Sequence, residues 1–309
     1  MFTKQFLTTV IDRSAETPLD RRKLLTMTGL AGAGTAAAML VPATAASAAD
    51  APSDASILNF ALNLEYLEAE FYLRAVTGRG LSAIDGNGTV GGVTGGREVH
   101  FRTKAIKNYA REIAQDERAH VAFLRGALAG AKVARPAINL RDSFTAAAQA
   151  AGVVKKGQKF DAFANETNFL LAAFLFEDVG VTAYKGAAAF LSNKTYLDAA
   201  AGILAVEAYH AGIIRSTLYA EGYHASSIYH TVQKLSDARD SLDGHSDDDQ
   251  GIGSKKTGNL VPTDKNSIAF GRTTGQVLNI VYLNPAPVTK GGFFPAGVNG
   301  DINTSADSR

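Results

Sequence analysis

The sequence predicts an all-α protein, built as a four-helix bundle followed by a fifth helix and a mostly irregular C-terminal extension. Apolar residues recur at helical spacing in four long segments, 53–76, 103–130, 161–191 and 196–221. These segments form two successive pairs, and both pairs carry the same polar residues in the same order. The repetition indicates a duplicated helical hairpin, and two such hairpins close a bundle.

The first helix of each pair carries a carboxylate on its apolar face, seven residues before a tyrosine. Glu65 precedes Tyr72 in this way, and Glu177 precedes Tyr184. Glu68 shares the face of Glu65 and is the alternative candidate, but the repeated tyrosine spacing favours Glu65. We expect Tyr72 and Tyr184 to hydrogen-bond ligand carboxylates. Ordinary core packing or a redox role are the alternatives.

The second helix of each pair carries a Glu-x-x-His motif on its apolar stripe. The first copy is Glu117 with His120, and the second is Glu207 with His210. An unpaired charge buried on such a stripe costs several kcal/mol, so something must compensate it. A single copy would fit a core histidine bonded to its glutamate. The second copy favours metal binding instead.

The repeated motifs predict a site for two divalent metal ions. The candidate ligands are Glu65, Glu117, His120, Glu177, Glu207 and His210. Two divalent cations bring four positive charges, which neutralise the four carboxylates. Oxygen and imidazole ligands suit iron or manganese, and we expect iron in preference to manganese.

Four motifs resemble a known family, the exported ferritin-like proteins that include the desiccation-associated proteins. The motifs are LEYLE at 64–68, DERAH at 116–120, FEDVG at 176–180 and EAYH at 207–210. The similarity runs from about residue 53 to residue 300, including DQGI at 249–252 and GFFP at 292–295. It implies a ferritin-like di-metal bundle over 53–225, with the helix and irregular extension of 226–309 packed on it.

Residues 1–48 are predicted to be a twin-arginine signal peptide. Arg21 and Arg22 precede the weakly apolar run 24–41, and Ala46-Ser47-Ala48 offers a cleavage site. The alternative is a membrane anchor, but a run of about 18 residues is marginal for a span. We therefore expect an exported protein of the periplasm, the cell envelope or the medium, with no stable membrane span after processing.

Composition excludes several classes of function. The 309 residues contain no cysteine, so disulfides, thiolate metal sites and a rubredoxin-type electron donor are absent. The net charge is +1 and no basic patch with interleaved aromatics occurs, so we expect no nucleic-acid partner. Residues 86–91 match G-x-G-x-x-G, but no strand precedes them. We therefore interpret 77–96 as a flexible loop across the bundle end.

The remaining segments give weaker signals. A short helix is expected over 142–151, capped by Asp142 or Ser143, and a fifth helix over 224–242. The acidic residues 243–250 are interpreted as a solvated loop, with calcium binding as the alternative. A capping box indicates a helix over 273–283, although its apolar run would also suit a strand.

The leading functional hypothesis is an exported di-metal protein that acts on oxygen, peroxide or iron, as a ferroxidase, peroxidase or catalase-like oxidoreductase. As an enzyme it would need an external electron donor for net reduction. The alternative is a non-catalytic envelope or stress protein with a structural metal site. Iron storage in a cage is disfavoured by the glycine-rich loop and the long C-terminal extension, and a homo-oligomer is left open.

Overall fold

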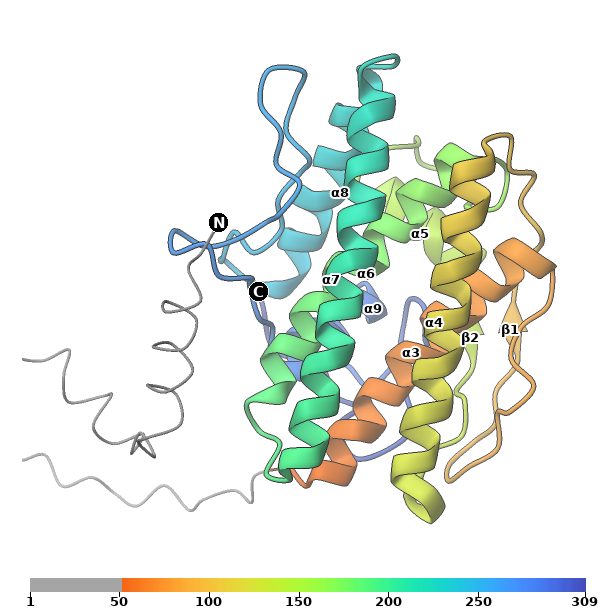
Figure 1. Cartoon of the computed structure of the whole chain (residues 1–309), viewed down its shortest axis with the longest axis vertical. Coiled ribbons are helices and arrows are strands. Elements are labelled where there is room, and N and C mark those ends of the chain that lie inside the picture. Colours follow the sequence, from red (N-terminus) through yellow and green to blue (C-terminus); the bar gives the residue numbers. More distant parts are fainter. Residues whose placement is uncertain (1–51) are drawn as a thin grey trace, which may run out of the picture. The chain divides into compact units, whose positions relative to one another are not determined.

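The computed structural model describes residues 52–309, so the predicted signal peptide at 1–48 lies outside the described residues. The described part is helical, with one short parallel sheet (Figure 1). Its helices are α3 (Asp54–Thr77), α4 (Lys104–Leu128), η1 (Ala129–Ala131), α5 (Asp142–Ala150), α6 (Glu166–Ala188), α7 (Lys194–Gly222), α8 (Ser227–Asp243) and α9 (Thr274–Tyr282). The strands are β1 (Val93–Thr94) and β2 (Ile138–Asn139). The predicted fold class is confirmed.

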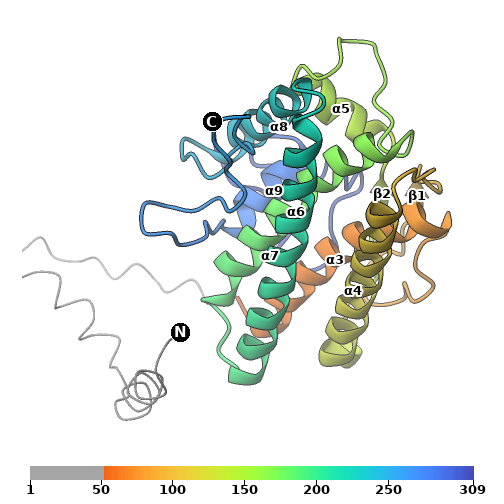
Figure 2. The ribbon, with the colours of Figure 1, turned by 45° about the horizontal axis from the view of Figure 1, so that its top comes forward.

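Four long helices form the bundle as two hairpins. Helix α3 packs on α4, α6 packs on α7, and α3 and α6 bring the hairpins together. Both views show α4 and α7 on one side of α3 and α6 (Figures 1 and 2). Helix α3 buries 20 of its 24 residues, whereas α7 buries 9 of 29. The bundle therefore has an inner pair, α3 and α6, and an outer pair whose helices bury one stripe each.

Helix α7 has unusual composition for an outer helix. Within residues 52–309 it is the one helix whose length and hydropathy would allow it to cross a membrane. Core helices of bundles pass the same test, because they too are long and poor in charge. Its buried stripe includes Glu207 and His210, which gives the stripe a role inside the bundle.

Side-chain caps fix where the helices begin. The hydroxyl of Ser53 accepts a hydrogen bond from the backbone of Ser56, and Thr273 and Gln276 form the expected capping box. Helix α6 begins at Glu166 rather than near residue 161, because the side chain of Asn165 caps it. The strand alternative for residues 277–283 is wrong, since α9 covers most of them.

The cap predicted for the short helix α5 is also wrong. Asp142 and Ser143 lie inside the helix, and neither provides a cap. The side chain of Asn139 accepts hydrogen bonds from the backbone N–H groups of Arg141 and Asp142, at 3.0 and 2.8 Å. The cap is therefore supplied from strand β2.

The glycine-rich connection does not simply cross the bundle end. Backbone hydrogen bonds join residues of this connection, from Ile84 to Thr94, to the segment 132–140. Strands β1 and β2 are part of this pairing. The added Cβ of an alanine at Gly91 would lie 2.0 Å from the backbone of Ala137, so this glycine permits the close approach.

The C-terminal extension covers the inner helices. Asn63 on α3 donates to the carbonyl of Asn299 at 2.8 Å and accepts from its N–H at 3.0 Å. The ring of Phe293 lies against Phe144 and Phe176, with centroids 5.0 Å apart in both pairs. Hence α3 and α6, buried on most of their surface, depend on the tail for their outer packing.

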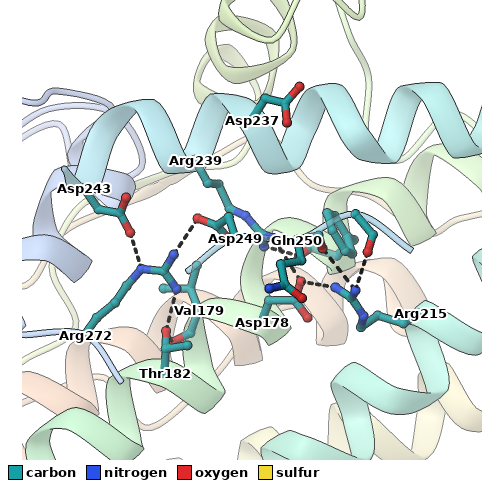
Figure 3. A network of polar contacts seen from close by, with 12 residues as sticks. Asp178, Val179, Thr182, Arg215, Asp237, Arg239, Asp243, Asp249, Gln250 and Arg272 are labelled. Carbon is teal, nitrogen blue, oxygen red and sulfur yellow. Dashed lines mark hydrogen bonds and ion pairs between the residues drawn. The ribbon is translucent and has the colours of Figure 1, made fainter. Parts of the chain in front are cut away.

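A chain of buried ion pairs ties α6 to α7, α8 and the extension (Figure 3). Asp178 on α6 accepts from Arg215 on α7 at 2.7 Å and from Arg239 on α8 at 2.9 Å. Asp249 accepts from Arg272 and forms an ion pair with Arg239. Because aspartates and arginines alternate along this chain of contacts, each buried charge lies next to an opposite charge, without which its burial would be costly in free energy.

The interpretation of residues 243–250 as a solvated loop is wrong for two of its aspartates. Asp243 and Asp249 are buried, and both form ion pairs with Arg272. Their oxygens also lie near a carboxylate oxygen of Asp240. The arginines already balance these charges, which disfavours the calcium alternative.

Candidate metal centre

The bundle brings all six predicted ligands to one place. Helix α3 supplies Glu65, and α6 supplies Glu177. The outer helices α4 and α7 each supply a Glu-x-x-His pair. They form two groups, in each of which the ligand atoms lie within 4.8 Å of one another. The groups are Glu65, Glu117, His120 and Glu207, and Glu117, Glu177, Glu207 and His210. Glu117 and Glu207 belong to both.

The two tyrosines connect the hairpins crosswise. Tyr72 on α3 donates a short hydrogen bond to Oε1 of Glu177 on α6. Tyr184 on α6 donates an equivalent bond to Oε1 of Glu65 on α3. Each tyrosine therefore fixes one oxygen of its carboxylate, and the other oxygen of Glu65 and of Glu177 is left for the centre.

Both histidines turn Nδ1 toward the carboxylates. Nδ1 of His120 lies 3.2 Å from Glu65 and 3.6 Å from both Glu117 and Glu207. Nδ1 of His210 lies 3.0 Å from Oε1 of Glu117 and 3.6 Å from Glu177. Glu117 is thus closer to the histidine of the other motif than to its own, and it stands between the two groups.

Asp116 is a site residue that the sequence analysis missed. Its carboxylate lies 3.1 Å from Nε2 of His210, across from α4 to α7. A proton on Nε2 leaves the Nδ1 lone pair free, which is the tautomer a metal-binding histidine needs. The position directly before Glu117 gave no signal, because the second motif has no acidic residue there.

The ligand atoms fit a bound cation better than any other partner. Eight buried atoms of the six residues have no hydrogen-bond partner within the described chain. They are Oε2 of Glu65 and Glu177, both oxygens of Glu117 and Glu207, and Nδ1 of His120 and His210. Buried polar atoms are ordinarily satisfied. No lysine or arginine of residues 52–309 forms an ion pair with these four carboxylates, so divalent cations fit as their partners.

The electrostatics of the centre support the same conclusion. Burial, reinforced by neighbouring carboxylates, raises the pKa of Glu117 and Glu207 well above the usual range. Burial also raises the pKa of Glu177, to about 8. For Glu65 burial acts in the same direction, but the imidazole of His120, 3.2 Å away, outweighs it and lowers the pKa of Glu65. Without cations the centre therefore holds protons in their place.

Glu68, the alternative to Glu65, lies beside the centre rather than in it. Glu68 is buried, with an exposed fraction of 6%, but it belongs to neither ligand group. Gly180 lies on α6, three residues after Glu177. A Cβ at this position would lie 2.3 Å from Oε2 of Glu207 and 3.4 Å from Oε1 of Glu68. The glycine makes room for these two carboxylates.

A comparison with known families agrees with this geometry. Residues 53–220 match the model of the ferritin-like domain, which is more than half of the chain. The chain belongs to the ferritin-like family. The predicted resemblance to the desiccation-associated members is confirmed, whereas twin-arginine export stays a prediction.

Two relatives of this ferritin-like protein have descriptive names. Desiccation-related protein PCC13-62 of Craterostigma plantagineum is 31% identical, covering 80% of this chain and 83% of the relative. Ferritin-like catalase Nec2 of Nesocodon mauritianus is 28% identical, covering 81% and 85%. No solved structure shows significant similarity to the chain. The ferritin-like fold and the buried carboxylate and histidine groups fit the binding of divalent metal ions.

Proposed function

We propose that this protein binds two divalent metal ions, iron in preference to manganese, and acts on a small oxygen species. Peroxide is the substrate that we favour. The observation that carries the proposal is the convergence of eight buried ligand atoms that lack any other partner. The name of the relative Nec2, a ferritin-like catalase, supports peroxide as the substrate. Catalase chemistry needs no electron donor other than peroxide, and a ferroxidase takes electrons from its Fe²⁺ substrate, whereas a peroxidase needs a separate electron donor.

The six residues divide into terminal and shared ligands. Glu65 and His120 would hold one ion, and Glu177 and His210 would hold the other. Glu117 has one oxygen near each histidine, so it would bind both ions, as would Glu207, which belongs to both groups. Two adjacent ions, when bound, would hold and activate a small oxygen species.

The chain's own residues position the ligands. Tyr72 and Tyr184 each hold a terminal carboxylate in one orientation, and Asp116 fixes the ring of His210. The carboxylates of Glu65, Glu117 and Glu207 are fully buried. Burial excludes bulk water and strengthens the attraction between these carboxylates and any bound cation.

Peroxide consumption by the mature, metal-loaded protein tests the proposal. The variant His120→Ala loses one candidate ligand, and we expect its rate of peroxide consumption to fall by about 10- to 100-fold or more. Substitution of residues that only support a metal ligand already causes losses of about this size. His230→Ala is the matched control, because His230 is exposed on α8. A protein that holds metal but consumes no peroxide and oxidises no iron would contradict the enzymatic role. It would leave a structural metal site in a stress protein.

Export is the second part of the proposal. We propose that the protein leaves the cytoplasm by the twin-arginine route and loses residues 1–48, as Arg21 and Arg22 and the Ala46-Ser47-Ala48 site indicate. N-terminal sequencing of exported protein should give a start at or next to Ala49. Exported protein that begins at Met1 would contradict cleavage, and unimpaired export of the double lysine variant would contradict the route.

A further inference from the structure

A second candidate site lies next to the metal centre. A cavity of about 80 Å³ runs between α3, α6, α8 and α9, with α5 at its side. Most of its wall is apolar, and Leu64, Phe176 and Val179 are among the residues that form it. Ala150 and Ser241 in its wall are exposed, so the cavity reaches the surface. Glu68 and Gly180, also in its wall, lie beside the metal centre.

Glu68 is the polar residue in this wall that lacks a partner. Three lining residues are strongly polar, namely Glu68, Arg239 and Ser241. Arg239 forms ion pairs with two aspartates, and the hydroxyl of Ser241 donates to the carbonyl of Ala238. No hydrogen bond or ion pair joins Glu68 to any of residues 52–309. A carboxyl group that is 6% exposed ordinarily has a hydrogen-bond partner.

Water does not fit this cavity well. A buried water needs two to four polar partners, and apolar cavities of this kind stay dry or take up apolar molecules. A cavity of about 150 Å³ holds the six carbon atoms of benzene, so a cavity of about 80 Å³ suits roughly three or four non-hydrogen atoms. The occupant must also offer one hydrogen-bonding group to Glu68.

We propose that the cavity binds a short-chain organic molecule with an apolar body and a terminal hydroxyl, the chemistry that small alcohols and alkyl hydroperoxides share. The body lies among the apolar side chains, and the hydroxyl bonds Glu68. A hydroxyl donates to a carboxylate and accepts from a carboxylic acid, so it satisfies Glu68 in either protonation state. Because Gly180 has no side chain, the bound hydroxyl lies close to the oxygens of Glu207.

Titration by ¹⁹F NMR tests the proposal on the mature protein as purified. The probe is 2-fluoroethanol, and fluoroethane is the matched probe without a hydroxyl. We expect saturable binding of the alcohol, weakened about 10-fold by Glu68→Leu, as for one lost hydrogen bond to a buried group. Glu68→Gln should bind the alcohol within about threefold of wild type, since an amide keeps the hydrogen bond. Binding of fluoroethane should be equal in all three proteins.

A plug variant separates this cavity from other surfaces. Ala238 is half-buried and lines the cavity, so Ala238→Phe should abolish binding of both probes. Ala146→Phe, at an exposed alanine of α5 outside the lining, should leave binding unchanged. Absence of saturable binding, or equal binding by Ala238→Phe, would overturn the proposal. So would equal affinity of the alcohol for wild type and a folded Glu68→Leu variant. These measurements need no turnover, so an inactive metal centre would not affect them.

Discussion

Glu117 and Glu207 differ from the other two ligand carboxylates in how many oxygens they leave free. Tyrosines occupy one oxygen each of Glu65 and Glu177, whereas both oxygens of Glu117 and Glu207 lack partners. A carboxylate with two free oxygens can bridge two ions, and one with a single free oxygen suits a terminal position. If two ions bind as proposed, the hydrogen bonds of the tyrosines would therefore make Glu65 and Glu177 terminal ligands and leave Glu117 and Glu207 as the shared ones.

Gly180 sets the position of Glu207, and its replacement should disturb the metal site. In Gly180→Ala the new Cβ would lie 2.3 Å from Oε2 of Glu207, so the carboxylate must move. We expect at least a 10-fold loss of Mn²⁺ affinity in calorimetric titration, comparable to the loss of a supporting residue. Gly202→Ala on α7 is the control, because a Cβ there meets nothing within 4 Å. Unchanged affinity of Gly180→Ala would contradict this assignment.

The candidate ligands were predictable from the sequence because they repeat. Glu-x-x-His recurs at Glu117 and Glu207, and spacing along one helix was enough to place each pair on a buried stripe. Asp116 was not predictable, since its partner His210 lies 94 residues away on α7. Its role depends on how two helices face each other, which no local pattern encodes.

At the level of elements, the inner helices α3 and α6 require a cover that the outer helices do not provide. The extension supplies it through Asn299 and Phe293, and the buried arginines join it to the bundle (Figure 3). Asp178 lies directly after Glu177, so the same ion pairs also restrain the stretch of α6 that carries a ligand.

Removal of one buried arginine should destabilise the whole described part. Arg272→Leu would leave Asp243 and Asp249 buried without this partner, and breaking a buried pair costs about 3–5 kcal/mol. Urea unfolding followed by circular dichroism measures the change. Arg309→Leu is the matched control, because its pair with Asp307 is exposed, and we expect no measurable change. Equal free energies of unfolding for the two variants would show that the buried ion pairs of Arg272 do not stabilise the protein.

Helices were predictable from periodicity, but contacts between distant elements were not. The start of α6 shifted from residue 161 to Glu166 because a cap, rather than the apolar pattern, decided it. Asp243 and Asp249 looked solvated in a run of acidic residues. Their partner Arg272 lies 23 or more residues further on, so only the folded chain shows that these charges are paired and buried.

At the level of the whole molecule, the centre links stability to pH. The ordinary pKa of Glu177 is 4.5, and burial raises it to about 8 in the folded protein. A raised pKa adds stability at low pH, and that stability is lost as the pH rises from about 4.5 through about 8. Glu117 and Glu207 act in the same direction, and Glu65 opposes them.

The metal-free protein should therefore melt at a lower temperature at pH 8 than at pH 5. Differential scanning calorimetry in the presence of a chelator measures this. The metal-loaded protein is the control, because cations bind the deprotonated ligands and gain affinity as the pH rises. The difference in melting temperature between the metal-loaded and the metal-free protein should therefore be larger at pH 8 than at pH 5. A chelator effect that is absent, or equal at both pH values, would contradict the link.

The central claim is that six residues on four helices hold two metal ions, and metal content tests it most directly. After iron loading and dialysis, elemental analysis of the mature wild-type protein should give about two ions per chain, as in bundles with this ligand set. The double variant Glu117→Gln, Glu207→Gln removes both shared carboxylates and should retain well under one ion. A wild-type protein that holds no metal and rejects both iron and manganese would contradict the claim. Two ions retained in the double variant would contradict it equally.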